Sequence, residues 1–282
     1  MRDVTEGQVR RGPHIVLVGG RSTGQVTLPY NGVFWHDRKL LVTGMGHSGS
    51  NLLTDMIRAS NCYNFTPHVE DRDFCDGLLV AYLRNYATKL CIDNPENFPM
   101  TKFHNIMDRF PNLKVLVSIR HPVDTTLSWV YRELPIEMGG DSIETAVEDV
   151  DLAPEVRIAR WHGEIFPNIM TILNEYGREN RSIGFRMEDI IRDPKNSARQ
   201  VASWLEIPYR DEMAEPWKIS RHEGQLSRYR KKLNTEQIDV YKRWKTDYNG
   251  FYADKRDMVA YFMEQLTPIA AAWGYHVDMG VL

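Results

Sequence analysis

One stretch near the start of the chain, residues 39–58, constrains the fold more than any other. It reads KLLVTGMGHSGSNLLTDMIR: a short apolar run, three glycines within six positions, then apolar residues at helical spacing. Successive backbone N–H groups in a glycine loop that opens a helix form an anion cradle, and the helix N-terminus adds partial positive charge. The stretch therefore predicts a strand, a loop that holds a phosphate or sulfate group of a nucleotide, and a helix.

Strand and helix patterns alternate along the rest of the chain. The apolar run KVLVSI predicts a buried strand over 114–119, and Pro122 suits the first turn of a following helix. Further patterns predict a strand over 182–185 and helices over 76–91, 155–176, 195–205 and 255–273, with Gly177 as a C-cap. This alternation predicts a three-layer α/β fold, in which helices cover both faces of a parallel sheet. The glycine loop and Arg120 both follow strands, so we expect them to face one site at the carboxyl edge of the sheet.

We interpret residues 1–38 as an N-terminal β extension and residues 39–282 as the main domain.

Composition narrows the classes of function that the chain could have. The net charge of −3 provides no overall field to attract a nucleic acid polymer, and no apolar run is long enough to span a membrane. The three cysteines (Cys62, Cys75 and Cys91) lie far apart, which is typical of free thiols in a reducing compartment. We therefore expect a cytoplasmic protein.

The glycine loop also fits other motifs. Gly44, Gly46 and Gly49 form the G-x-G-x-x-G pattern of an NAD(P)-dependent Rossmann oxidoreductase, but no convincing second strand leads to the acidic residue that binds the ribose. A P-loop kinase needs Lys and Ser/Thr after Gly49, where this chain has Ser50 and Asn51. A tight turn that only packs a helix on a strand is the structural alternative.

Four segments in chain order carry a resemblance. They are TGMGHSGSNLL (43–53), VSIRHPVDTTLSWVYR (117–132), FRMEDIIRDPKNSARQVASWLEIP (185–208) and GQLSRYRKKLNTEQI (224–238). They resemble, respectively, the 5′-phosphosulfate loop, the Arg-x-Pro…Ser motif, the R-x-E-D segment and the late G-x-W-R-x-x-L loop of sulfotransferases that use 3′-phosphoadenosine-5′-phosphosulfate (PAPS). Tyr229 stands where Trp is common in that family. The resemblance implies a P-loop-like nucleotide fold and transfer of a sulfuryl group from PAPS to a hydroxyl acceptor, leaving adenosine 3′,5′-bisphosphate (PAP).

The resemblance also implies a donor site. Its members are the loop, the arginine and serine of the second motif, and a basic flap: Gly46, His47, Ser48, Gly49, Ser50, Asn51, Arg120, Ser128, Arg228, Tyr229 and Arg230. Arg120 suits the 3′-phosphate because a guanidinium is a planar, bidentate donor. The acceptor is expected to be a carbohydrate or a small molecule.

His47 is a departure, because the family usually has Lys or Arg there to neutralise the bridging oxygen as the sulfur–oxygen bond breaks. An imidazole does this only when it is protonated. Lys102 and Arg120 are the alternative cations for this role.

The acceptor hydroxyl needs a base. Thr101–His104 is similar to the Lys-Thr-His segment of cytosolic sulfotransferases, whose His is the base. If residues 100–104 form a strand, Lys102 and His104 share a face, and His104 becomes the candidate base. Glu70 is the second candidate, because Golgi members use a Glu after the first helix, and His68 is the third. The mechanism requires no metal.

Overall fold

A computed structural model describes residues 38–65, 85–92, 100–139, 154–218 and 254–275, and for residues 131–139, 154, 155, 157 and 161 only the backbone. Within these ranges, five parallel strands form one sheet. The strands are β1 (Lys39–Gly44), β2 (Asn64–Phe65), β3 (Tyr86–Cys91), β4 (Leu113–Ile119) and β5 (Ser182–Arg186). Their order in the sheet is β2-β3-β1-β4-β5.

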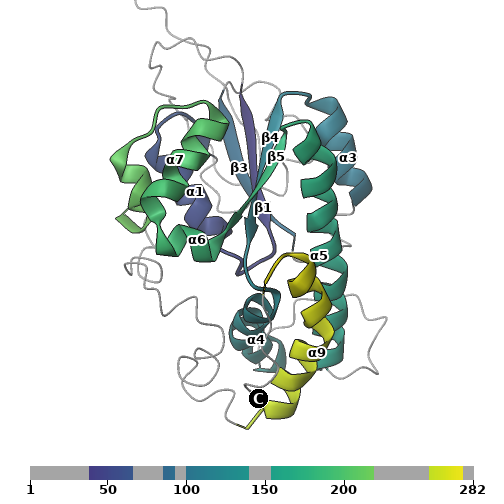
Figure 1. Cartoon of the computed structure of the whole chain (residues 1–282). Helices are drawn as coiled ribbons and strands as arrows, with labels where there is room; N and C mark the ends of the chain where they lie inside the picture. Colours follow the sequence, from purple (N-terminus) through teal and green to yellow (C-terminus); the bar gives the residue numbers. More distant parts are fainter. Residues whose placement is uncertain (1–37, 66–84, 93–99, 140–153, 219–253, 276–282) are drawn as a thin grey trace, which may run out of the picture. The chain divides into compact units, whose positions relative to one another are not determined.

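Helices cover both faces of this sheet (Figure 1). They are α1 (Ser50–Ala59), α3 (Met100–Arg109), α4 (Pro122–Gly139), α5 (Pro154–Arg178), α6 (Met187–Arg192), α7 (Pro194–Leu205) and α9 (Arg256–Ala272), with the 3-10 turns η2 (Asp211–Ala214) and η3 (Pro216–Lys218). One apolar cluster joins α1, α6 and α7 to the sheet, and a second joins α3, α4, α5 and α9 to its other face. The predicted three-layer α/β fold is confirmed.

Strand β1 lies at the centre of the sheet because all its side chains are buried and it needs a neighbour on both edges. It pairs with β3 on one side and β4 on the other, and Gly44 lies level with Cys91 and Ser118. The carboxyl ends of three strands therefore meet beside the glycine loop. In a Rossmann fold the strand after the first helix would pair directly with β1, whereas here β3 lies between β1 and β2.

Two predicted elements are wrong. Residues 86–91 form strand β3 rather than the end of a helix, because Tyr86, Thr88 and Leu90 alternate with smaller or charged residues and the strand is buried between β1 and β2. Residues 100–104 begin helix α3 rather than a strand, and Phe103, Ile106 and Met107 form its buried face at helical spacing.

Strand β2 lies where the sequence showed no convincing strand, whereas β4, β5, α5, α7 and α9 lie within about two residues of their predicted ranges. Helix α5 runs past Gly177 to Arg178, so the predicted C-cap lies inside the helix. The predicted N-terminal β extension lies almost wholly outside the described residues, so the division at residue 38 stays a prediction. No described helix is both long and apolar enough to cross a membrane.

Candidate active site

The glycine loop connects β1 to α1 through backbone angles that favour glycine. Gly44 has φ +143°, and a Cβ there would lie 2.6 Å from the Ser118 carbonyl oxygen. Gly49, with φ +99°, precedes α1, and its carbonyl accepts the first helical hydrogen bonds. A side chain at either position would strain the backbone, and one at Gly44 would also collide with β4.

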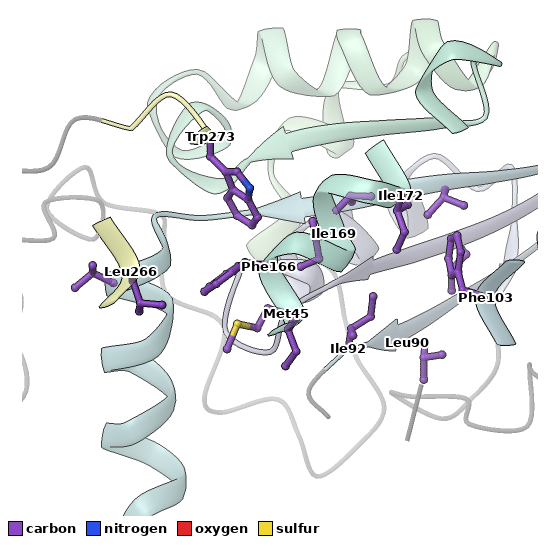
Figure 2. Close-up of a cluster of buried hydrophobic side chains, with 14 of the residues drawn as sticks. Met45, Leu90, Ile92, Phe103, Phe166, Ile169, Ile172, Leu266 and Trp273 are labelled. Atoms are coloured by element: carbon purple, nitrogen blue, oxygen red, sulfur yellow. The ribbon is translucent and has the colours of Figure 1, made fainter. Parts of the chain in front are cut away.

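The loop is anchored in the apolar core by Met45, which is 1% exposed. Figure 2 shows Met45 in the cluster that also contains Phe166, Ile169 and Trp273. Phe166 and Trp273 pack edge to face, with ring centroids 5.0 Å apart. An apolar side chain between two glycines thus fixes the loop against α5 and the end of α9.

Residues at the end of β4 hold the loop from the other side. The Ser118 hydroxyl donates to the Ser48 carbonyl oxygen (2.7 Å), and Arg120 Nη1 donates to the His47 carbonyl oxygen (2.9 Å). Arg120 Nη2 also forms an ion pair with Asp124, in the first turn of α4. Arg120 is 4% exposed and Asp124 1%, so this pair is buried and fixes the guanidinium beside the loop.

His47 links the loop to α4. Its backbone has φ +64°, which is uncommon for a residue other than glycine, although histidine adopts it more readily than most residues. Its Nδ1 lies 3.3 Å from the Ser128 hydroxyl. The structure therefore brings together three residues that the sequence analysis placed in one site: His47, Arg120 and Ser128.

A second histidine, His162 on α5, lies near His47 and contacts α4. It is 2% exposed, and its Nδ1 lies 2.5 Å from the Thr126 hydroxyl on α4. Burial, reinforced by the nearby His47, lowers the pKa of His162 to about 3. His162 is therefore neutral at physiological pH, and it packs edge-on against Trp129 and Phe166.

The sequence analysis missed two residues near the loop, Lys89 and Cys91 on β3. Because side chains alternate along a strand, both point to the same face as Ala87, which packs in the α1 cluster. Lys89 Nζ donates to Asn51 Oδ1 (2.9 Å), and Cys91 Sγ lies 3.3 Å from Ser50 Oγ. Lys89 is 5% exposed, so a buried cation lies at the first turn of α1.

Two predicted catalytic residues do not join this group. Lys102 and His104 lie on helix α3, where residues two apart point in different directions. His104 Nδ1 lies 2.6 Å from Tyr176 Oη, near the end of α5 that leads into β5. His104 therefore lies toward the edge of the sheet where the strands begin, away from the loop.

Several predicted site residues lie outside the described part of the chain, and their roles stay predictions. They are His68, Glu70, Arg228, Tyr229 and Arg230.

Comparison with known proteins identifies the family. The family model described as "Sulfotransferase family" matches residues 68–211, just over half of the 282 residues. The chain belongs to the sulfotransferase family. Its activity is therefore sulfuryl transfer, and the oxidoreductase and kinase alternatives are not favoured. A comparison of this sulfotransferase with curated proteins finds no match.

Solved structures share the fold of this sulfotransferase. The sulfotransferase domain from the curacin biosynthetic pathway has a TM-score of 0.56 at 14% identity, over 86% of this chain and 99% of that one. The sulfotransferase from Alicyclobacillus acidocaldarius has a TM-score of 0.50 at 14% identity, over 86% and 98%. The sulfotransferase domain from the Synechococcus PCC 7002 olefin synthase has a TM-score of 0.50 at 13% identity, over 86% and 95%. Identities this low show the fold alone.

Proposed function

We propose that this sulfotransferase takes the sulfuryl group from PAPS and transfers it to a hydroxyl group of a carbohydrate or small molecule. One observation carries the proposal: Arg120 and Ser128, which resemble a 3′-phosphate site, both contact His47 of the glycine loop. Two anion-binding segments from distant parts of the sequence thus form a single site. A nucleotide with phosphates at both the 3′ and 5′ positions suits that arrangement.

The loop has further features that fit a 5′-phosphosulfate. The first turn of α1, all of which is described, carries no acidic side chain, and Gly49 provides no side-chain cap. The Ser48 hydroxyl is buried and has no hydrogen-bond partner among the described residues. A buried hydroxyl without a partner is costly, and an anion bound in the loop would satisfy it. The positive end of the α1 dipole faces the same loop.

Each cation has a proposed role. Arg120, with Ser128, binds the 3′-phosphate, because the guanidinium has five N–H donors and its described partners, His47 and Asp124, do not use all of them. His47 and Lys89 neutralise the charge that grows on the bridging oxygen as the sulfur–oxygen bond breaks. Lys89 replaces Lys102 in this role because it lies at the first turn of α1.

The reaction needs one base and no redox step. The acceptor oxygen forms a bond to sulfur, the bond from sulfur to the 5′-phosphate oxygen breaks, and the hydroxyl proton passes to a base. Glu70 is the proposed base, and it lies outside the described residues. The described residues hold no group of three or more His, Cys, Asp or Glu that would bind a metal. The metal-free mechanism stays a prediction, which activity in the presence of EDTA would test.

Calorimetry with PAP tests the donor site. Wild-type protein is expected to bind PAP, and Arg120→Lys to bind it about 10- to 100-fold more weakly, because lysine keeps the charge beside Asp124 but loses the planar fork. Arg181→Ala is the matched control: Arg181 also bonds backbone carbonyls, those of Met107 and Phe110, but at the opposite edge of the sheet. Absence of PAP binding by the folded wild-type protein would remove the proposal.

The acceptor and the location are separate proposals. Labelled PAPS with a panel of carbohydrate, phenol and alcohol acceptors identifies the acceptor class, and failure of every hydroxyl acceptor would contradict this part.

We place the protein in the cytoplasm, which the free thiols of Cys62 and Cys91 support. Cell fractionation is the test, and recovery of the protein in an oxidising compartment would contradict it.

A further inference from the structure

The R-x-E-D segment of the sequence has so far no role in the site. It lies where β5 passes into α6, with Arg186 as the last residue of the strand and Glu188 in the first turn of the helix. The segment resembles part of a sulfotransferase, yet neither side chain belongs to the glycine loop or its anion-binding partners. The contacts of these two side chains indicate what the segment does.

Glu188 holds the turn that follows Arg120. Its Oε1 accepts a hydrogen bond from the backbone N–H of His121 (2.9 Å), and the residue is 5% exposed. His121 lies between Arg120 and Pro122, the first residue of α4. A buried carboxylate that accepts a backbone N–H forms a strong, charge-assisted hydrogen bond. Glu188 therefore fixes the peptide next to the arginine that faces the loop.

The other oxygen of Glu188 binds a distant part of the chain. Oε2 accepts a hydrogen bond from the Tyr275 hydroxyl (2.9 Å), just beyond α9. Burial, and then the nearby Glu188 carboxylate, raise the pKa of Tyr275, so its hydroxyl stays protonated and able to donate. The Tyr275 ring packs edge-on against the His121 ring, with centroids 5.0 Å apart.

Arg186 holds the same end of α9. Its guanidinium lies over the Tyr275 ring, 4.7 Å from the centroid, and donates to the Trp273 carbonyl oxygen. Trp273 is in turn part of the apolar cluster that contains Met45 of the loop. The end of α9 thus contacts the site from two directions: through Glu188 to the Arg120 turn, and through Trp273 to the loop.

We propose that Glu188 is a positioning residue for the nucleotide site, and that with Tyr275 it forms a clasp that holds the Arg120 turn in its binding geometry. The clasp acts on the nucleotide only through Arg120. The choice of PAP as the ligand in this inference rests on the proposed function. If Glu188 acted only through its charge, its removal would tighten PAP binding, because a carboxylate near two phosphates repels them.

The main test is calorimetry of PAP binding by three variants. Glu188→Ala is expected to bind PAP roughly tenfold or more weakly, because the His121 N–H loses its charged acceptor. Glu188→Gln keeps a carbonyl acceptor for that N–H, so we expect it to restore binding to within about threefold of wild type. Tyr275→Phe loses one neutral hydrogen bond and is expected to bind PAP a few-fold more weakly.

Asp193→Ala is the control for a general loss of stability. Asp193 caps α7 by accepting from the Asn196 N–H (3.0 Å) and touches neither the loop nor the Arg120 turn in any described contact. Its loss is expected to lower the melting temperature and leave PAP affinity unchanged.

In an Arg120→Lys background, Glu188→Ala is expected to add little to the loss of PAP affinity, because both changes act on one interaction.

A second readout does not depend on the nucleotide. In PAP-free protein, Glu188→Ala is expected to speed hydrogen exchange at the His121 amide, while Asp193→Ala leaves that amide protected. If wild type fails to bind PAP, the proposed function fails while the exchange experiment still tests the clasp. If wild type binds PAP and folded Glu188→Ala binds it equally or more tightly, the clasp is overturned.

Discussion

His47 stands at a position where the sulfotransferases that this chain resembles usually carry lysine or arginine, and its contact with Ser128 supports its role in the proposed donor site. If a cation at this position neutralises the bridging oxygen, its removal slows the breaking of the sulfur–oxygen bond. We expect His47→Gln to lower kcat by about 100-fold and His47→Lys to keep kcat within about tenfold of wild type, since lysine supplies the same charge. The measurement is kcat at saturating PAPS for the three proteins. An unchanged kcat in His47→Gln would assign the role to Lys89.

His162 makes a prediction about stability. Burial lowers its pKa to about 3, below the ordinary value of about 6.5 for the unfolded chain. Between pH 6.5 and 3, His162 is protonated in the unfolded chain but neutral in the folded protein. The free energy of unfolding is therefore highest above pH 6.5 as far as His162 is concerned, and it decreases as pH falls below that value. At pH 5 the loss is about 2 kcal/mol.

The check is urea denaturation at pH 8 and pH 5. His162→Asn keeps a polar partner for Thr126 but does not titrate, so it is expected to lose about 2 kcal/mol less than wild type between the two pH values. An equal loss in both proteins would show that other groups cause the acid sensitivity.

Individual residues were predictable where a backbone motif demanded them. Gly44, Gly49 and Arg120 follow from strand-loop-helix patterns, whereas Ser128 was expected from the resemblance to the family motif. The structure brings all four to one edge of the sheet. Lys89 was missed because a lysine inside a strand does not indicate burial unless the partner that satisfies it, here Asn51, is known. His104 was misplaced because a short three-residue likeness carries no information about the element on which it lies.

At the scale of elements, the loop between β1 and α1 depends on Gly49. Its φ of +99° is strained for alanine, and a Cβ would lie 3.1 Å from the Met187 side chain. We expect Gly49→Ala to lower stability by about 1–3 kcal/mol and to weaken PAP binding, because the helix N-terminus would shift. Thermal melts and calorimetry measure the two effects. A variant that melts and binds PAP like wild type would show that the loop tolerates another geometry.

Elements were predicted well where hydrophobic pattern and length agreed, as for β1, β4 and α7. Strand β3 was not, because it carries Thr88 and Lys89 in its buried interior, and polar residues at these positions obscure the strand pattern. Helix α3 was misread for the opposite reason: its apolar spacing was present, but the likeness to a strand segment was given more weight.

At the scale of the whole molecule, alternation of strands and helices was enough to predict the three layers, because only a covered parallel sheet buries such apolar strands. The strand order was not predictable. Whether β1 pairs with β2 or with β3 depends on contacts between residues some 47 positions apart, such as Lys39 with Tyr86. That order is what separates this fold from a dinucleotide-binding one.

Ligand binding gives a test at this scale. PAP at 100 times its Kd is expected to stabilise the folded protein by about 2.7 kcal/mol, because it binds the native state alone. NADH at the same concentration is expected to leave the melting temperature unchanged, since the strand order does not form a dinucleotide site. A rise in melting temperature with NADH and not with PAP would reverse the assignment of the donor.

The contacts of Glu188 also set an order in which the site is completed during synthesis. Its hydrogen bonds reach back 67 residues to His121 and forward 87 residues to Tyr275. A nascent chain that has emerged from the ribosome as far as β5 already contains the loop, Arg120 and Ser128, but not the tyrosine that completes the clasp. We expect such a chain to assemble much of the sheet and still bind nucleotide weakly until Tyr275 emerges.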